Sequence, residues 1–139
     1  MSDAPPATEL RVGLEGHFER AVAFEYTTAA FDPKLPAIFS TPAMIAFMEA
    51  ATSIAVQPAL APGTITVGTR IEVDHIKATG IGSLVRATAR LAAINGRFLI
   101  FDVEARAAGE VLGRGQITRA IVDLDRMHQR AAATAPPSR

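Results

Sequence analysis

The sequence contains no cysteine among its 139 residues. A thiol nucleophile, a disulfide framework and thiolate metal sites are therefore excluded, and the redox compartment stays open because nothing can be oxidised to a disulfide. The 14 basic and 14 acidic residues give a formal net charge of zero and are mixed along the chain. Because a nucleic-acid backbone selects a basic stripe, we expect no nucleic-acid partner.

Long apolar runs are also missing. No run approaches the roughly 20 residues needed to cross a bilayer, and the N-terminal MSDAPPATE lacks the basic start and apolar centre of a signal peptide. We therefore expect no membrane partner and a cytoplasmic location. The sequence has no metal-ligand motif, phosphate loop, dinucleotide fingerprint or nucleophile elbow, so no metal or cofactor is predicted.

The length of the chain fits one domain. We predict this domain at residues 10–126, between flexible tails at residues 1–9 and 127–139, because neither end has a pattern that could pack. Hydrophobic residues make up 49% of the sequence, which is high for a small soluble protein. Some apolar surface is therefore expected to lie in a subunit interface.

Periodicity and turn signals predict a strand, one helix and then four consecutive strands. The first strand is expected at residues 16–26, and the helix runs from Ser40 and Thr41, both good capping residues, to about Gln57. The later strands are expected at residues 65–75, 83–94, 97–107 and 111–124, with turns at Asn95-Gly96 and Gly109. The last three of these strands should form an antiparallel meander.

The predicted helix, PAMIAFMEAATSIAVQ, is apolar on nearly all sides and should be buried all round. An antiparallel sheet that curls around the helix supplies most of that cover. The fold class is therefore α+β, a hotdog fold with an antiparallel β-sheet wrapped around one long buried α-helix. A second copy would close the remaining flank, which predicts a homodimer.

Glu49 is the only ionisable side chain between Lys34 and Arg70, and it lies in the middle of the apolar helix. A carboxylate removed from water must be paired, hydrogen-bonded or held protonated. Such groups cluster in active sites, although some are structural and are satisfied by backbone or by a partner chain. We favour a catalytic role for Glu49.

His75 and Thr41 each admit two interpretations. Strict alternation places one set of side chains on the helix-facing side of the strand: Ile65, Val67, Thr69, Ile71, Val73 and His75. His75 is then either a core histidine bonded to a carbonyl or the partner of Glu49 in acid–base chemistry. Thr41 is either a helix cap or a hydroxyl placed where a developing oxyanion would be stabilised.

Helix geometry limits how these residues combine, because a rise of about 1.5 Å per residue separates Thr41 and Glu49 by roughly 12 Å. Either Thr41 lies off the helix end and folds back, or the site is built from both chains at a dimer interface, which we favour. Gly68 interrupts a strand, which is typical of a β-bulge or of a close backbone approach by a ligand.

Three stretches resemble the signature segments of the fluoroacetyl-CoA thioesterase family of hotdog proteins: FSTPAMIAFMEAA from Phe39, VGTRIEVDH from Val67 and GRGQITRAIVDL from Gly113. The resemblance runs in register from about Leu10 to Leu124. It implies that a homodimer hydrolyses a short acyl-CoA, without cofactor or metal, at sites between the subunits. It also implies that Thr41, Glu49 and His75 form the catalytic set.

The same resemblance assigns substrate-binding residues. A family glycine near the thioester matches Gly68, and a family arginine near the bound substrate matches Arg119. Leu35 and Phe39 complete the predicted substrate-binding set. Asp32 and Leu35 stand where the fluoroacetyl-specific enzyme has lid phenylalanines, so fluoroacetyl is not itself predicted as the acyl group.

Two alternative functions remain open from the residues alone. One is a hotdog hydratase or dehydratase that uses the same carboxylate and histidine on an acyl-CoA. The other is a non-catalytic protein that binds an acyl-CoA or another apolar ligand. In such a protein, the Glu49 carboxylate has its hydrogen-bond partners but takes part in no reaction. Arg119, Lys77 and Arg70 are candidates for contacts with the phosphates of coenzyme A, on charge alone.

Overall fold

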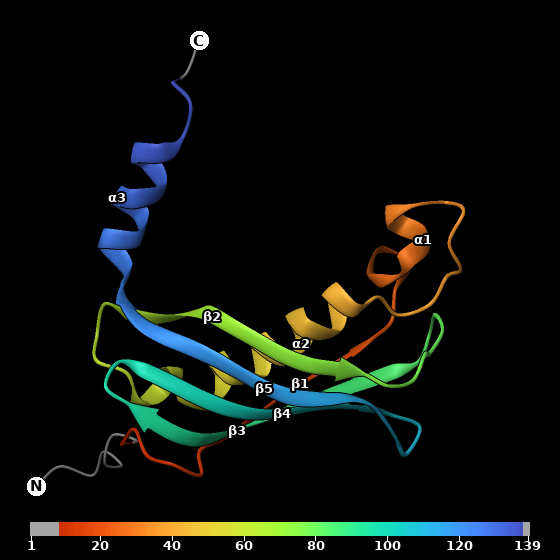
Figure 1. Cartoon of the computed structure of the whole chain (residues 1–139), viewed down its shortest axis with the longest axis horizontal. Helices are drawn as coiled ribbons and strands as arrows, with labels where there is room; N and C mark the ends of the chain where they lie inside the picture. Colours follow the sequence, from red (N-terminus) through yellow and green to blue (C-terminus); the bar gives the residue numbers. More distant parts are fainter. Residues whose placement is uncertain (1–8, 138–139) are drawn as a thin grey trace, which may run out of the picture.

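The computed structural model describes residues 9–137, which form one five-stranded antiparallel sheet with a long helix packed on one face (Figure 1). The strands are β1 (Glu15–Ala21), β2 (Thr64–His75), β3 (Leu84–Asn95), β4 (Phe98–Ala107) and β5 (Glu110–Asp123), in the spatial order β1-β3-β4-β5-β2. The helices are α1 (Thr28–Phe31), α2 (Thr41–Val56) and α3 (Leu124–Thr134), with 3-10 turns η1 (Phe24–Tyr26) and η2 (Gln57–Ala59). The predicted α+β class, with a sheet around one long helix, is confirmed.

Strands β3, β4 and β5 pair consecutively, which confirms the predicted meander. The first hairpin turns through Gly96, whose φ is +61°, because Asn95 already pairs with Phe98. The second turns through Ala108 and Gly109, with φ of 51° and 76°. Only the second turn has two successive positive φ angles, and the first has one, at its first central residue. Both arrangements are turns whose twist matches the flanking strands, so both hairpins arise from local turn chemistry.

The first predicted strand, residues 16–26, is too long. Pairing between β1 and β3 ends at Ala21 and Leu84, and residues Phe24–Tyr26 form η1 instead. The ring of Tyr26 packs edge-on against Phe47 of α2, with ring centroids 5.2 Å apart. Tyr26 therefore covers the helix from η1 and does not continue the strand.

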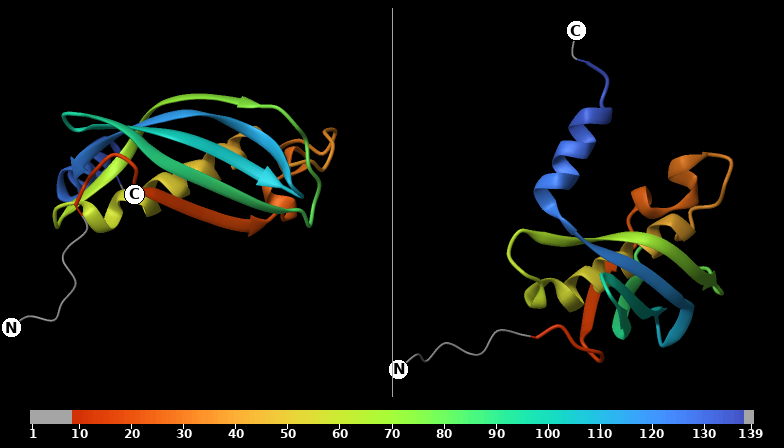
Figure 2. Two further views of the ribbon diagram at one scale, coloured as in Figure 1. Left: turned by 90° about the horizontal axis from the view of Figure 1, so that it is seen from below. Right: turned by 60° about the vertical axis from the view of Figure 1, so that its left-hand side comes forward.

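Helix α2 is covered on one side only, so the prediction of burial all round is wrong for the single chain. The side against the sheet buries Met44, Phe47, Met48, Ala51, Thr52, Ala55 and Val56. The opposite side, called here the outer stripe, consists of Pro42, Ile45, Ala46, Glu49, Ala50, Ser53 and Ile54, and Ile54 is 50% exposed. A single curved sheet arches over one face of the helix and leaves the other open (Figure 2).

A β-bulge in β2 changes which side chains face the helix. The pairing of β2 with β5 runs from Gly68 opposite Arg119 directly to Arg70 opposite Thr118, so Thr69 is an extra residue. The extra residue resets the alternation. Val73 and His75 face α2 as predicted, whereas on the other side of the bulge Thr66 and Gly68 face it in place of Ile65 and Val67.

The C-terminal stretch predicted to be a flexible tail, residues 127–139, is helical as far as Thr134. Its helix, α3, begins after Asp123, whose carboxylate accepts a hydrogen bond from the N–H of Arg126 at 2.9 Å, and it continues through alanines, which favour helix. None of the α3 residues is buried, and the helix points away from the sheet (Figures 1 and 2).

The N-terminal tail predicted at residues 1–9 lies outside the described residues except for Glu9. In residues 9–137, no helix combines the length and the apolar character that spanning a membrane requires.

Strand β1 passes so close to α2 that only glycine fits at position 16. A Cβ atom on Gly16 would overlap the backbone of Ala51 and Ala55, whereas one on Gly80 would meet nothing within 4 Å. We expect Gly16→Ala to lower the free energy of unfolding by about 1–3 kcal/mol in urea denaturation. The matched Gly80→Ala should change it by less than about 0.5 kcal/mol, and equal midpoints for the two variants would contradict this close approach.

Candidate active site

The predicted catalytic residues form two separate pairs along α2. Thr41 and His75 meet at the N-terminus of the helix, where Thr41 Oγ1 lies 2.7 Å from His75 Nδ1. Glu49, near the middle of the helix, pairs with Arg119 of β5, and Arg119 Nη1 lies 2.8 Å from Glu49 Oε2. In the part of the chain that the structure describes, no hydrogen bond joins one pair to the other.

The hydroxyl of Thr41 is free for His75 because Ser40 caps the helix. Ser40 Oγ accepts a hydrogen bond from the N–H of Ala43 at 3.2 Å, and Thr41 is the first helical residue. The interpretation of Thr41 as a mere cap is therefore wrong. Its hydroxyl instead contacts an imidazole at the end of β2, beside the first turn of the helix.

His75 has one ring nitrogen occupied and one without a partner. Nδ1 meets Thr41, and either group can donate, according to the tautomer. Nε2 is buried and has no hydrogen-bond partner within residues 9–137. Since a buried polar atom without a partner is costly, this nitrogen suits a bond to a ligand or to a second chain. The alternative of a core histidine bonded to a carbonyl is wrong.

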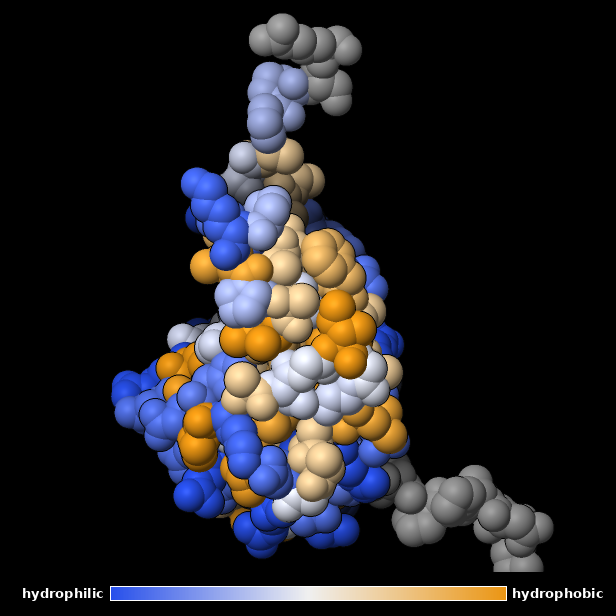
Figure 3. Space-filling model, turned by 90° about the vertical axis from the view of Figure 1, so that its right-hand side faces the viewer, coloured by the Kyte–Doolittle hydropathy of each residue, from blue (hydrophilic) through white to orange (hydrophobic). Residues whose placement is uncertain are grey.

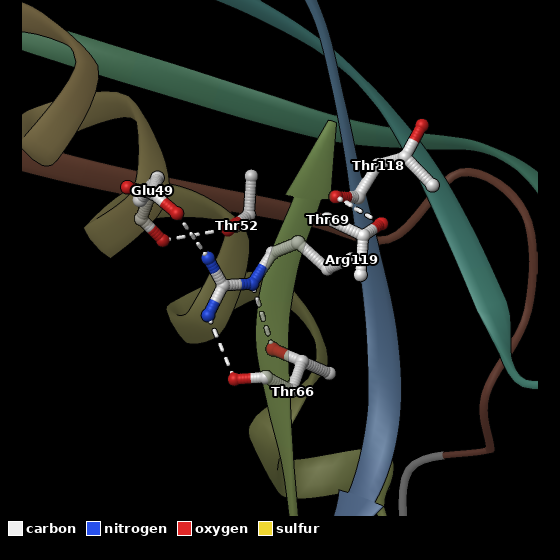
Figure 4. Close-up of polar contacts among 6 residues, drawn as sticks. All are labelled: Glu49, Thr52, Thr66, Thr69, Thr118 and Arg119. Carbon is white, nitrogen blue, oxygen red and sulfur yellow. Dashed lines mark hydrogen bonds and ion pairs between the residues drawn. The ribbon is translucent and has the colours of Figure 1, made fainter. Parts of the chain in front are cut away.

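Glu49 and Arg119 form an ion pair that is partly buried. Arg119 is 7% exposed, and it donates from Nε to Thr66 Oγ1 and from Nη2 to the Thr66 carbonyl, each at 2.8 Å (Figure 4). Burial lowers the pKa of Arg119 and the nearby Glu49 carboxylate opposes that shift. The expectation that Glu49 needs a partner is confirmed, and the partner is Arg119, not His75.

Gly68 lies at the bulge, opposite Arg119 on β5. A Cβ on Gly68 would lie 2.5 Å from Glu49 Oε2, so a larger residue would collide with the carboxylate. Of the two alternatives predicted for this glycine, the bulge is present, and approach by a ligand stays a prediction. The approaching group within the chain is the side chain of Glu49.

Both Thr41 and Glu49 are helical, since α2 spans Thr41–Val56. This excludes the first of the two geometric alternatives, in which Thr41 lies off the helix and folds back. About 12 Å of rigid helix separates the two residues. One chain alone therefore does not bring the three predicted catalytic residues together.

Leu35 and Phe39 occupy different environments. Leu35 helps to line a hollow of about 450 Å³ beside the start of α2, together with Glu25, Thr27, Thr28, Ala30, Phe31, Ser40 and Pro42. Figure 3 shows exposed apolar side chains at this end of the molecule, where Phe31 is 92% exposed. Phe39 is 1% exposed, packs against Phe47 and meets the ring of His75 edge-on, with centroids 6.4 Å apart. Phe39 thus packs against the imidazole ring of His75.

A family model described as fluoroacetyl-CoA-specific thioesterase matches residues 14–125. The chain belongs to this family. A fluoroacetyl-CoA thioesterase of Streptantibioticus cattleyicolor is 34% identical over 103 residues, which cover 74% of each chain.

Solved structures agree with this family assignment and with the fold. A structure of the fluoroacetyl-CoA thioesterase has a TM-score of 0.85 and 30% identity, and the match covers 93% of this chain and 100% of the other. A hot-dog-like protein from Thermanaerovibrio acidaminovorans has a TM-score of 0.79 at 20% identity, covering 91% of this chain and 94% of the other. The predicted hotdog fold is confirmed.

Sequence reasoning missed one residue of the candidate site, Thr66, because strict alternation placed it on the outer face of the sheet. The signal that could have found it was Gly68, whose predicted bulge reverses the faces of the residues before it.

Of the cations proposed for coenzyme A phosphates, Arg119 points inward, while Lys77 and Arg70 are exposed beside Glu110 and Glu72. In residues 9–137, no three potential metal ligands cluster closely enough to share an ion.

The Glu49–Arg119 pair should matter far more to stability than a surface pair. Arg119→Met leaves the Thr66 carbonyl and the Glu49 carboxylate without their donors, and we expect the free energy of unfolding to fall by about 2–3 kcal/mol in urea denaturation. The control Lys77→Met removes the exposed pair with Glu110 and should cost no more than about 1 kcal/mol. If both variants unfold at the same denaturant concentration, the buried pair is not stabilising.

Proposed function

We propose that this member of the fluoroacetyl-CoA-specific thioesterase family hydrolyses a short acyl-CoA thioester to the carboxylic acid and free coenzyme A. The proposal rests on one observation, that Glu49 is both paired with Arg119 and partly exposed. Its Oε2 atom is held by a buried arginine, yet its side chain is 35% exposed on the outer stripe of α2. A carboxylate that is fixed at one oxygen and partly exposed is suited to act on a bound thioester.

Two routes for Glu49 remain possible. In the first, the carboxylate accepts a proton from water while the water oxygen attacks the thioester carbonyl carbon. In the second, the carboxylate itself attacks, and water then opens the anhydride that forms. In both routes the C–S bond breaks and the sulfur leaves as the thiol of coenzyme A. The Thr41 hydroxyl and the Gly68 N–H would stabilise the oxyanion.

The active site is proposed to form between two copies of the chain, with Glu49 from one and the Thr41–His75 pair from the other. Three observations support this assembly. The outer stripe of α2 is apolar around Glu49. Strand β2 ends the sheet with one edge unpaired, which favours pairing with another chain. The buried Nε2 of His75 also requires a partner that the described chain does not supply.

Four residues are proposed to serve the substrate in different ways. Leu35, on the wall of the hollow beside Thr41, would contact the apolar part of the substrate. Gly68 would offer its N–H next to Glu49. Phe39 would act through the imidazole that it supports, and Arg119 through the carboxylate that it holds.

Thiol release is the direct test of the proposed reaction. We expect free thiol from at least one member of a panel of acetyl, fluoroacetyl, longer aliphatic and aromatic acyl-CoAs. Glu49→Gln should lower kcat at least about 10²-fold, the usual size of an acid–base contribution. The matched control Glu72→Gln removes an exposed carboxylate from the opposite face of the sheet and should retain wild-type turnover.

Each alternative function gives a different result in this assay. A hydratase or dehydratase would change the acyl group and release no thiol. A binding protein would retain acyl-CoA without turnover, and Glu49→Gln would then leave its affinity nearly intact. Wild-type thiol release by the Glu49→Gln variant would contradict the catalytic role proposed for Glu49.

Mixing two inactive variants tests whether the site is shared. Thr41→Ala and Glu49→Gln, co-expressed with different tags, should give heterodimers in which one site combines the intact Glu49 of one chain with the intact Thr41 of the other. With random pairing, half of the dimers are mixed and each has one intact site of two, so thiol release should recover to about a quarter of wild type.

The control is a mixture of Thr41→Ala with His75→Ala. These two changes affect the same pair, which meets within one chain. Each site of a mixed dimer then carries one of the two changes, so thiol release should stay as low as in the single variants. Recovery in this control would show that Thr41 and His75 of one site come from different chains. A mixture of Thr41→Ala with Glu49→Gln that stays inactive, while purified heterodimer is present, would show that each site uses residues of one chain only.

A further inference from the structure

We propose that Thr66 is a positioning residue, which orients the guanidinium of Arg119 and thereby fixes the carboxylate of Glu49. The inference rests on the catalytic role proposed for Glu49. It adds a residue on β2 that contacts no reacting atom and acts only through the ion pair.

Thr66 supplies two of the three acceptors around Arg119. Its hydroxyl accepts from Nε and its carbonyl accepts from Nη2, each at 2.8 Å. Because the guanidinium is planar and rigid, two bonds to one residue fix both its position and its rotation. The remaining nitrogen, Nη1, is then directed at Glu49 on α2 (Figure 4).

Burial makes the Thr66 hydroxyl hard to replace by solvent. Thr66 and Arg119 are both buried, and the Nε–H has no other partner among the described residues. Removal of the hydroxyl would leave a charged donor unsatisfied away from water, which is costly. The guanidinium would then be expected to rotate, and the carboxylate that it holds would rotate with it.

The bulge in β2 is what brings Thr66 to this place. Thr69, the extra residue, donates its hydroxyl to the Thr118 carbonyl at 3.2 Å, next to Arg119 in the chain. With this offset, Thr66 and Gly68 both face α2. Gly68 makes room for the carboxylate, and Thr66 aims the cation at it. The bulge in β2 therefore places both Gly68, which leaves space for the Glu49 carboxylate, and Thr66, which binds Arg119.

The test compares three variants by steady-state thiol release. Thr66→Val keeps the shape of the side chain but removes the acceptor, and we expect kcat to fall about 10–100-fold, as for a misplaced catalytic group. KM should change less than about threefold, since substrate contacts are intact. Thr66→Ser restores the hydroxyl and should recover kcat to within about threefold of wild type.

Thr52→Val is the matched control. Thr52 is a buried threonine whose hydroxyl donates to the main-chain carbonyl of Glu49 at 2.6 Å and not to Arg119 (Figure 4). We expect it to lower the melting temperature about as much as Thr66→Val does while retaining wild-type kcat. Equal loss of kcat in both variants would mean that Thr66 is only structural, and would overturn the inference.

The outcomes separate this inference from the proposed function. If Glu49→Gln is inactive and Thr66→Val has wild-type kcat, the inference fails and the proposed function stands. If Glu49→Gln is active, the role of the acid fails and that of Thr66 fails with it.

A measurement on the wild type covers the case in which Thr66→Val does not fold. The Nε–H signal of Arg119, assigned by its loss in Arg119→Lys, should exchange slowly with solvent in the wild type and in Thr66→Ser. Fast exchange in the folded wild type would overturn the inference.

Discussion

The positive charge of Arg119 lies inside the protein, and such a charge is stable only when acceptors surround it. Its acceptors come from two elements, Thr66 on β2 and Glu49 on α2. To meet both, β2 requires a bulge at Thr69 and a glycine at position 68. The ion pair thus links the register of the edge strand, the choice of glycine and the location of the acid on the helix.

A second constraint is the rigidity of α2. Thr41 and Glu49 belong to one continuous helix, so no adjustment of side chains brings them together. The sheet covers the opposite side of this helix and leaves Glu49 on an apolar, open stripe. In the assembly proposed for this member of the fluoroacetyl-CoA-specific thioesterase family, the Thr41–His75 pair and Glu49 are the two parts of one active site. A second copy that packs on the stripe would join them and remove its apolar surface from water.

The segment before α2 lies apart from the residues proposed for the chemistry. The hollow that Leu35 and Phe31 line is beside the Thr41 end of the helix, and none of the predicted catalytic side chains lines it. Changes in the residues that line the hollow would therefore leave the ion pair and the Thr41–His75 contact in place.

The sequence by itself determined the features that depend on local pattern. These include the apolar helix with its lone acid, the succession of strands along the chain, both hairpin turns and the bulge signal of Gly68. It did not determine the partner of Glu49, because Arg119 is 70 residues away and arrives only when β5 lies between β4 and β2. It also misplaced Thr66, since one bulge reverses the face of every residue beyond it. Periodicity is set by neighbours along the chain, whereas the pairing of charges and the one-sided cover of α2 are set by which strands become adjacent, and only the tertiary structure decides that.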